Sequence, residues 1–249
     1  MAFSFDEFIP VYPRQDDPNL QYNINTKKEF LDVAGEPRER RPTPGQLYKH
    51  QEAFRRYMIH SDRMLNIQSV GTGKTCAMVS IAEYYKKYKD IENIKKVYIL
   101  VSGPSIEEEI KRQIACDCTL KDYLNEQVMD STKQGIYRQK ALTRSINQWY
   151  KIMTYGKMAK EVIKLGLNAE NIDRVYSGSL FLVDEAHYLN DKRSNKQFKE
   201  ESGEDMDIDP TSPDNTTLEE QYQVLWKLFH SVKRSKIILS TATPMVNDV

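Results

Sequence analysis

The 249-residue sequence has little cysteine, no excess of charge of either sign and no long hydrophobic run. No apolar stretch approaches the roughly 20 residues that a membrane-spanning helix requires, so we expect no membrane partner. The first residues lack the basic and then apolar order of a secretory signal, which predicts an intracellular protein. With 36 basic and 36 acidic residues the net charge is zero, so a globally basic surface for nucleic acid is excluded and only local contacts remain.

The three cysteines, Cys76, Cys116 and Cys118, predict a reducing compartment. Cys116 and Cys118 have no second pair of ligands nearby, so we interpret them as packing residues and not as a metal site. Cys76 stands at a predicted helix start, where the pKa of a thiol can fall. A small buried helix residue is the more common role at such a position.

The sequence does contain a glycine turn between a predicted strand and a predicted helix. The apolar run at 64–67 precedes the segment 68–75, Gln-Ser-Val-Gly-Thr-Gly-Lys-Thr, and an amphipathic stretch follows. A phosphate-binding loop requires this order, because glycines and a helix N-terminus turn backbone N–H groups towards an anion. Lys74 would reach the β- and γ-phosphates, and the Thr75 hydroxyl would ligate Mg²⁺. Gln68 stands where the strict motif has glycine, and a plain glycine turn before an ordinary helix is the alternative.

A second chemical site is predicted at the end of another buried strand. The apolar run at 179–183 ends in the segment 184–187, Asp-Glu-Ala-His. Two adjacent carboxylates are costly without a partner, and a Mg²⁺ ion held by Asp184 would resolve this. Glu185 is then placed to orient or deprotonate an attacking water. A plain surface turn is the alternative, which the upstream phosphate-loop motif makes less favoured.

Five short motifs follow five strand-like runs along the chain. In an open parallel sheet the carboxyl ends of the strands lie at one edge, so we expect the motifs to form a single site. The predicted fold class is therefore α/β, a mainly parallel sheet flanked by helices. Gln51, on a predicted helix upstream, is either a surface residue or an amide that reads adenine edges. The motifs occupy residues 71–75, 103–104, 154–155, 184–187 and 240–244.

This set resembles the first motor lobe of superfamily 2 helicases and translocases, in the Snf2-like branch with a D-E-A-H motif. The segment 71–75 is similar to motif I, 103–104 to motif Ia, 184–187 to motif II, and 240–244, Ser-Thr-Ala-Thr-Pro, to motif III. The helix start at 47–51 is similar to the adenine-reading glutamine motif, and Thr154 with Tyr155 resembles the T-Y motif. The resemblance covers residues 47 to 244 and implies a RecA-like P-loop domain.

The resemblance also implies an ATP hydrolase that uses ATP and Mg²⁺ and acts on nucleic acid, DNA or RNA. The implied catalytic residues are Lys74, Asp184 and Glu185, with Thr75 and Asp184 as Mg²⁺ ligands. The implied ATP-binding residues are Gln51, Val70, Gly71, Thr72, Gly73, Lys74 and Thr75. Coupling of the ATP state to the nucleic-acid grip is implied for His187, Ser240, Thr241 and Thr243. The residues expected along the nucleic-acid backbone are Gly103, Pro104, Thr154 and Tyr155.

The domain organisation follows from composition and from the resemblance. Residues 1–42 are rich in Pro, Asp, Asn and Arg and predict an extended N-terminal arm, and residues 43–249 predict the ATP-binding lobe. A highly charged insertion at 190–217 is predicted to be disordered. The family also needs a second RecA-like lobe with arginine fingers, which this chain lacks. We therefore expect a longer protein or a partner chain, and an isolated lobe that is nearly inactive.

The phosphate loop looks most like those of helicase-type transcription ATPases of large cytoplasmic DNA viruses. That group includes the small subunit of the poxvirus early transcription factor and nucleoside triphosphatase I, which implies transcription machinery as a partner and a place in the virion. Two other classes stay open, a P-loop ATPase switch that acts on protein and an inactive scaffold subunit. The motif at 240–244 favours a nucleic-acid motor over the switch, and the intact residues Lys74, Asp184 and Glu185 disfavour the scaffold.

Overall fold

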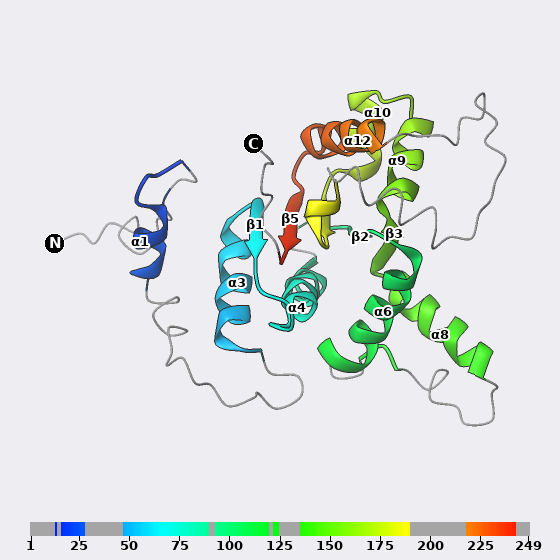
Figure 1. Cartoon of the computed structure of the whole chain (residues 1–249), viewed down its shortest axis with the longest axis horizontal. Helices are drawn as coiled ribbons and strands as arrows, with labels where there is room; N and C mark the ends of the chain where they lie inside the picture. Colours follow the sequence, from blue (N-terminus) through cyan, green and yellow to red (C-terminus); the bar gives the residue numbers. More distant parts are fainter. Residues whose placement is uncertain are drawn as a thin grey trace, which may run out of the picture.

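The computed structural model describes residues 13, 16–27, 47–89, 93–119, 122–124, 135–189 and 218–242. The insertion predicted at 190–217 lies outside these residues, and so does most of the predicted arm at 1–42. The described part of the arm forms a short helix, α1 (Leu20–Asn25), on which Ile24 is buried, so the arm is not extended throughout (Figure 1). Within the described ranges, no helix combines the length and the apolar character needed to cross a membrane.

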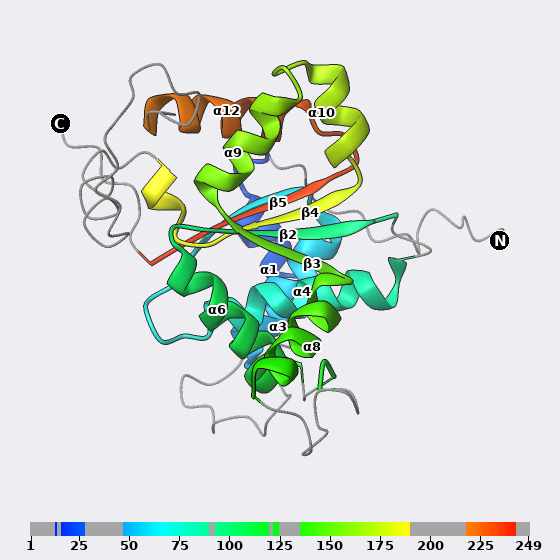
Figure 2. The ribbon, with the colours of Figure 1, turned by 90° about the vertical axis from the view of Figure 1, so that its right-hand side faces the viewer.

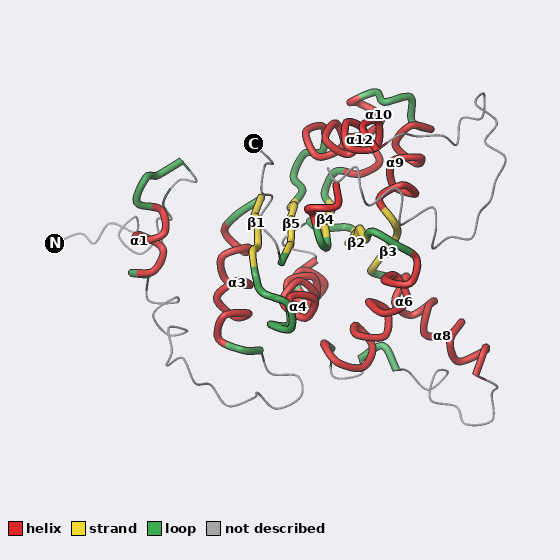
Figure 3. Tube along the Cα trace, viewed as in Figure 1, coloured by secondary structure: helices red, strands yellow, loops and turns green. Residues whose placement is uncertain are grey.

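A five-stranded sheet forms the centre of the molecule (Figure 3). All four strand pairs are parallel, and the strand order is β1-β5-β4-β2-β3. All five residues of β4 are buried, as expected for an inner strand of a parallel sheet that is covered on both faces. The predicted α/β fold of RecA type is therefore confirmed. The strands are β1 (Arg63–Ile67), β2 (Lys96–Val101), β3 (Tyr150–Thr154), β4 (Ser179–Val183) and β5 (Lys236–Thr241).

Helices cover both faces of the sheet, as Figure 2 shows. On one face lie α3 (Lys49–His60), α4 (Lys74–Lys87), α6 (Pro104–Gln113) and α8 (Gly135–Asn147). On the other face lie α9 (Tyr155–Lys164), α10 (Ala169–Tyr176) and α12 (Leu218–Ser231).

Each face of the sheet has its own apolar core. Met58, Ile81 and Ile110 belong to the first core, and Met158 and Leu228 to the second. A fully buried side chain of this kind contributes about 1.5–3 kcal/mol, so the two cores together hold the sheet between its helices. The strand ends that carry the predicted motifs are thereby fixed relative to one another.

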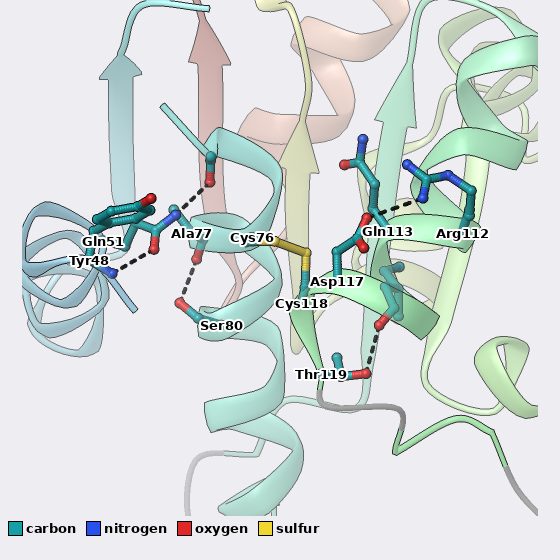
Figure 4. Close-up of a disulfide and its surroundings, with 12 residues drawn as sticks. Tyr48, Gln51, Cys76, Ala77, Ser80, Arg112, Gln113, Asp117, Cys118 and Thr119 are labelled. Atoms are coloured by element: carbon teal, nitrogen blue, oxygen red, sulfur yellow. Dashed lines mark hydrogen bonds and ion pairs between the residues drawn. A yellow bond between two sulfur atoms is a disulfide. The ribbon is translucent and has the colours of Figure 1, made fainter. Parts of the chain in front are cut away.

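A disulfide joins α4 to the short π-helix η2 (Ile114–Cys118), which continues from α6 (Figure 4). Its cysteines are Cys76 and Cys118, which lie 42 residues apart in the sequence. Cys116 is free and exposed. The expectation that Cys76 and Cys118 serve only as packing residues is therefore wrong, and the bond does not agree with the reducing compartment predicted from cysteine usage. The two cysteines meet because α4 and η2 pack against each other on the same face of the sheet.

We predict that Cys76→Ala lowers the unfolding midpoint of the oxidised protein. A cross-link across a sequence separation of 42 residues restricts the unfolded chain by about 4 kcal/mol of chain entropy. Thermal or urea unfolding with and without a reductant measures the effect. Cys116→Ala is the matched control, because it removes the cysteine that forms no disulfide and should leave the midpoint unchanged. Equal midpoints for the oxidised and reduced wild-type protein would contradict the prediction.

Candidate functional site

The carboxyl ends of three neighbouring strands bring the main predicted motifs together. β1 leads into the loop at 68–73, β4 leads into Asp184 and Glu185, and β5 leads into Ala242. The register aligns the last residue of β1 with the last residue of β5, and the last residue of β4 lies beside β5. The order β1-β5-β4 therefore places motif I, motif III and motif II side by side at one edge of the sheet.

The phosphate loop is a turn whose backbone suits glycine. Gly71 and Gly73 have φ angles of +81° and +80°, in the left-handed region that other residues rarely adopt. The helix α4 begins at Lys74, so the free N–H groups of its first turn lie at the end of the loop. Val70, at the tip of the loop, is 83% exposed. The loop thus presents backbone donors and the positive end of a helix dipole to an anion.

Gln68 takes the position at which the strict motif has glycine. The loop accommodates it, because the Thr72 hydroxyl donates to the Ser69 carbonyl at 2.8 Å and lies 3.4 Å from the side-chain oxygen of Gln68. The backbone N–H of Gln68 donates to the Thr241 carbonyl at 3.1 Å. With glutamine at this position, the loop is still hydrogen-bonded to the end of β5, and its own hydroxyl and carbonyl groups still bond to one another.

Two residues of α3 hold the phosphate loop from outside, and Figure 4 shows one of them, Gln51. Gln51 is 3% exposed, its Nε2 donates to the Gly73 carbonyl at 3.0 Å, and its Oε1 accepts from the Tyr48 backbone N–H at 2.9 Å. His50 Nε2 lies 3.0 Å from the Thr72 carbonyl. Gln51 is therefore not a surface residue, and both ends of its amide are engaged within the protein. Sequence reasoning missed His50, because a single histidine before the glutamine forms no recognisable pattern.

The Glu185 carboxylate connects motifs I, II and III. Its Oε1 accepts from Lys74 Nζ at 3.0 Å, and its Oε2 accepts from the Ala242 backbone N–H at 3.3 Å. His187 Nδ1 lies 3.4 Å from Oε2 and 2.8 Å from the Thr241 hydroxyl. The Lys74 side chain is 10% exposed and that of Glu185 is 25% exposed, so this ion pair is screened less by water than a surface pair. Lys74, Glu185, His187 and Thr241 were all predicted from the sequence, and the structure brings them together.

The carboxyl group of Asp184 lies in a poorly solvated position. Burial, and then the neighbouring Glu185 carboxylate, raise the pKa of Asp184 to about 6, although Lys74 acts in the opposite direction. A carboxylate disfavoured in this way suits a site that a cation completes. The Asp184 carboxylate and the Thr75 hydroxyl offer the oxygen donors that Mg²⁺ prefers. In the described parts of the chain no group of three or more His, Cys, Asp or Glu residues could hold a metal ion, so waters and phosphate oxygens would supply the other ligands of Mg²⁺.

The two residues of the T-Y motif are buried at the carboxyl end of β3, where α9 begins. Thr154 is 6% exposed, and its hydroxyl accepts from the Lys157 backbone N–H at 3.3 Å, which caps α9. Tyr155 is 3% exposed, and its hydroxyl donates to the backbone carbonyl of Asp184. The predicted contact of Thr154 and Tyr155 with a nucleic-acid backbone does not agree with this burial, because both polar groups already serve contacts inside the protein.

The remaining predicted residues are divided. Gly103 is the N-cap of α6 and Pro104 is its first residue, and Pro104 is exposed beside the end of β2. Ser240 is buried, and its hydroxyl accepts from Asn66 Nδ2 at 3.2 Å, so it joins β1 to β5. Thr243 lies outside the described residues. Asn66 was missed, because one polar residue in an apolar strand gives no signal until its partner is known.

The family comparison agrees with this geometry. The family model described as "Type III restriction enzyme, res subunit" matches residues 44–245, and the chain belongs to this family. The match to this family, together with the viral relatives described below, supports a helicase-type lobe of superfamily 2. The chain is thus an N-terminal RecA-like lobe of the kind found in proteins of large DNA viruses.

Three viral proteins are similar to this chain. The protein 087L of Invertebrate iridescent virus 3, named as an inferred helicase, is 28% identical over 256 residues, or 98% of this chain and 23% of the relative. The protein L377 of Acanthamoeba polyphaga mimivirus, named as an inferred ATP-dependent RNA helicase, is 28% identical over 156 residues, or 51% of this chain and 13% of the relative. The inferred helicase 009L of Frog virus 3 is 24% identical over 186 residues, or 74% of this chain and 17% of the relative. The chain therefore spans less than a quarter of the length of each.

We predict that Asp184→Asn raises the unfolding midpoint of the metal-free protein near neutral pH. The folded pKa of Asp184 is about 6, and that of an unfolded aspartate is about 3.9. The folded state therefore binds this proton more tightly and loses stability as the pH rises from about 4 to about 6. Asparagine avoids this loss, on the order of 1–3 kcal/mol at about pH 7.5. Unfolding in chelator across this pH range measures the gain, and a gain that does not shrink towards low pH would contradict the raised pKa.

A further prediction separates two roles of Gln51. If Gln51 chiefly holds the loop, Gln51→Met should weaken the binding of ATP and of inorganic tripolyphosphate by the same factor. The loss of one hydrogen bond corresponds to roughly 2- to 12-fold in affinity. Gln113→Met, on α6, serves as the control. Calorimetry with both ligands decides, because a residue that acts only by reading adenine would affect ATP and leave tripolyphosphate unchanged.

Proposed function

We propose that this chain is the ATP-binding lobe of an ATP-dependent nucleic-acid helicase or translocase. The observation that carries the proposal is the Glu185 carboxylate, which contacts Lys74 of the phosphate loop and the Ala242 N–H at the end of β5. A carboxylate in this position can change its hydrogen-bond and ion-pair partners when a phosphate group binds to Lys74. This arrangement supports a hydrolase whose nucleotide state is communicated along the sheet edge.

The chemistry follows from the competition for Lys74. Triphosphate oxygens attract the Lys74 ammonium more strongly than one carboxylate does, because they carry more negative charge. As Lys74 turns to the β- and γ-phosphates, the Glu185 carboxylate is released. It can then orient a water and accept its proton as the water oxygen attacks the γ-phosphorus and the bond to the β-phosphate oxygen breaks. Bound Mg²⁺, held by Thr75 and Asp184, would supply positive charge at the phosphate oxygens.

The same carboxylate offers a route for coupling. Glu185 Oε2 lies 3.4 Å from His187 Nδ1, which is 2.8 Å from the Thr241 hydroxyl at the end of β5. A change in the partners of Glu185 therefore alters a contact between motif II and motif III. Of the residues implied to contact nucleic acid, Pro104 is the exposed one at this edge of the sheet.

Nucleic acid is the proposed substrate, and the names of the relatives support it. All three relatives are named as helicases, and one of them as an RNA helicase. Because the chain spans less than a quarter of each relative, we propose that a second RecA-like lobe lies elsewhere in the longer protein or on a partner chain. A role in viral transcription is supported only by the likeness of the phosphate loop at 68–75 to those of viral transcription ATPases.

The test of hydrolysis uses the full-length protein and two substitutions. Glu185→Gln should reduce ATP turnover by about 10²–10⁴-fold, since an amide does not accept the water proton. It should also bind ATP at least as tightly as the wild type, because Lys74 loses its competing partner. Lys74→Ala should lose nucleotide binding. Titration with ATP·Mg²⁺ and steady-state turnover measure both effects, and unchanged turnover in Glu185→Gln would move the base to another residue.

The test of the substrate compares nucleic acids. ATP turnover of the full-length protein should rise on addition of RNA, single-stranded DNA or duplex DNA, and the stimulating polymer identifies the substrate. Residues 1–249 alone should turn over ATP slowly, because an arginine supplied by another lobe is worth about 10³–10⁵ in rate in related phosphoryl-transfer enzymes. An ATPase that no nucleic acid stimulates would favour a P-loop switch instead.

A further inference from the structure

Tyr155 directly follows a strand that is not adjacent to β4, yet it contacts the turn that follows β4. It is the first residue of α9, directly after β3, and β2 lies between β3 and β4. Neighbouring strands are about 4.8 Å apart, so Tyr155 reaches across about 10 Å of sheet edge. Its hydroxyl donates to the carbonyl of Asp184 and lies 3.4 Å from the carbonyl of Glu185. The contact uses the length of the tyrosine ring and the hydroxyl at its end.

The two carbonyls that face Tyr155 belong to the peptide planes on either side of the Glu185 Cα atom. The backbone of Glu185 has a φ of +51°, in the left-handed region. Such a conformation is unfavourable for a residue with a side chain and persists only where surrounding contacts hold it. The Tyr155 hydroxyl donates its one proton to the Asp184 carbonyl, and the Glu185 carbonyl accepts from the Tyr188 backbone N–H at 3.0 Å. Holding these two peptide planes also holds the direction of the Glu185 bond from Cα to Cβ between them. That direction points the Glu185 carboxylate at Lys74, 3.0 Å away.

The Tyr155 hydroxyl is suited to remain a donor. Tyr155 belongs to the second core, and its side chain is 3% exposed. Burial, and then the charges of Asp184 and Glu185, raise the pKa of Tyr155 well above its usual value. The phenol therefore keeps its proton, and the contact with the two carbonyls does not depend on pH near neutrality. Two backbone bonds also support the turn, because the Tyr188 N–H donates to the Glu185 carbonyl at 3.0 Å and the Asp184 N–H donates to the Leu100 carbonyl at 2.9 Å.

We propose that Tyr155 is a positioning residue for ATP hydrolysis, which holds the strained backbone of Glu185 so that its carboxylate faces the phosphate site. The proposal rests on the hydrolase function proposed above for the same site. It assigns to Tyr155 a task inside the protein in place of a contact with nucleic acid. It also makes Tyr155 important for the rate of hydrolysis and not for the binding of nucleotide, because Lys74 and the loop at 68–73 do not contact its hydroxyl.

The chain offers a matched control at the other end of β3. Tyr150 is 0% exposed, and its hydroxyl donates to Glu83 Oε1 at 2.6 Å. Tyr150 is four residues before Thr154, which ends β3 at the site. Along an extended strand this separation is about 13 Å. Tyr150→Phe therefore removes a buried hydroxyl at the far end of β3, away from motif II. Tyr155→Phe and Tyr150→Phe both keep the ring and its packing.

The experiment measures ATP turnover and nucleotide affinity of the full-length protein with each substitution. Tyr155→Phe should lower kcat by about 10- to 100-fold, since small misplacements of a reacting group carry losses of this size. Its KM and its affinity for ATP should stay within about twofold of the wild type. Tyr150→Phe should leave kcat within about twofold. An unchanged kcat in Tyr155→Phe, an equal loss in both variants, or a loss of affinity in place of kcat would overturn the proposal.

Hydrogen exchange gives a readout that does not require hydrolysis. In the protein without nucleotide, amides at 184–189 should exchange faster in Tyr155→Phe than in the wild type, and Tyr150→Phe should not change them. A wild-type protein that hydrolyses no ATP would refute the proposed function, and exchange would still decide whether Tyr155 holds the turn. Equal exchange at 184–189 in all three proteins would refute the positioning role even if turnover is normal.

Discussion

The parallel pairing of β5 with β1 on one side and with β4 on the other is the constraint on which the site depends. Parallel strands present their carboxyl ends at one edge, and the two apolar cores fix these ends from both faces of the sheet. The phosphate loop, the turn at Asp184 and the end of β5 are then neighbours by necessity. A shift in the register of β5 would separate the Ala242 N–H from Glu185 and break the link between motifs II and III.

At this edge of the sheet, the ion pair between Lys74 and Glu185 joins the phosphate loop to the turn after β4. Each group supplies what the other lacks while no phosphate is present, so neither charge stands unpaired in a partly buried place. Under the proposed function the pair is reversible, because a polyphosphate carries more negative charge than one carboxylate and would attract the ammonium more strongly. The contacts of Gln51 and His50 with consecutive loop carbonyls keep the loop in shape throughout this exchange.

The site holds local instability that the surrounding fold supports. Burial disfavours the charged form of the Asp184 carboxyl group. Glu185 has a backbone conformation that residues other than glycine rarely adopt. Such features gather where function needs a group in one direction or a charge in one place, and the rest of the molecule must stabilise them. Here the hydroxyl of Tyr155 and the packing of the second core provide part of that support.

The α/β class, the five strands and the candidate residues of motifs I and II could be predicted from the sequence, because apolar runs, glycine turns and adjacent acids are local features that need no distant partner. The sequence also indicated that His187 and Thr241 act together, through the family resemblance. The bond from Gln51 to Gly73, the burial of Tyr155 and the pairing of Cys76 with Cys118 could be seen only once the elements were packed together. The bond from Gln51 to Gly73, the contact of Tyr155 with Asp184 and the disulfide each join groups at least 22 residues apart in the sequence. The packing of helices and strands decides which donor reaches which carbonyl and which two thiols meet. These pairings cannot be predicted from the order of residues in the chain alone.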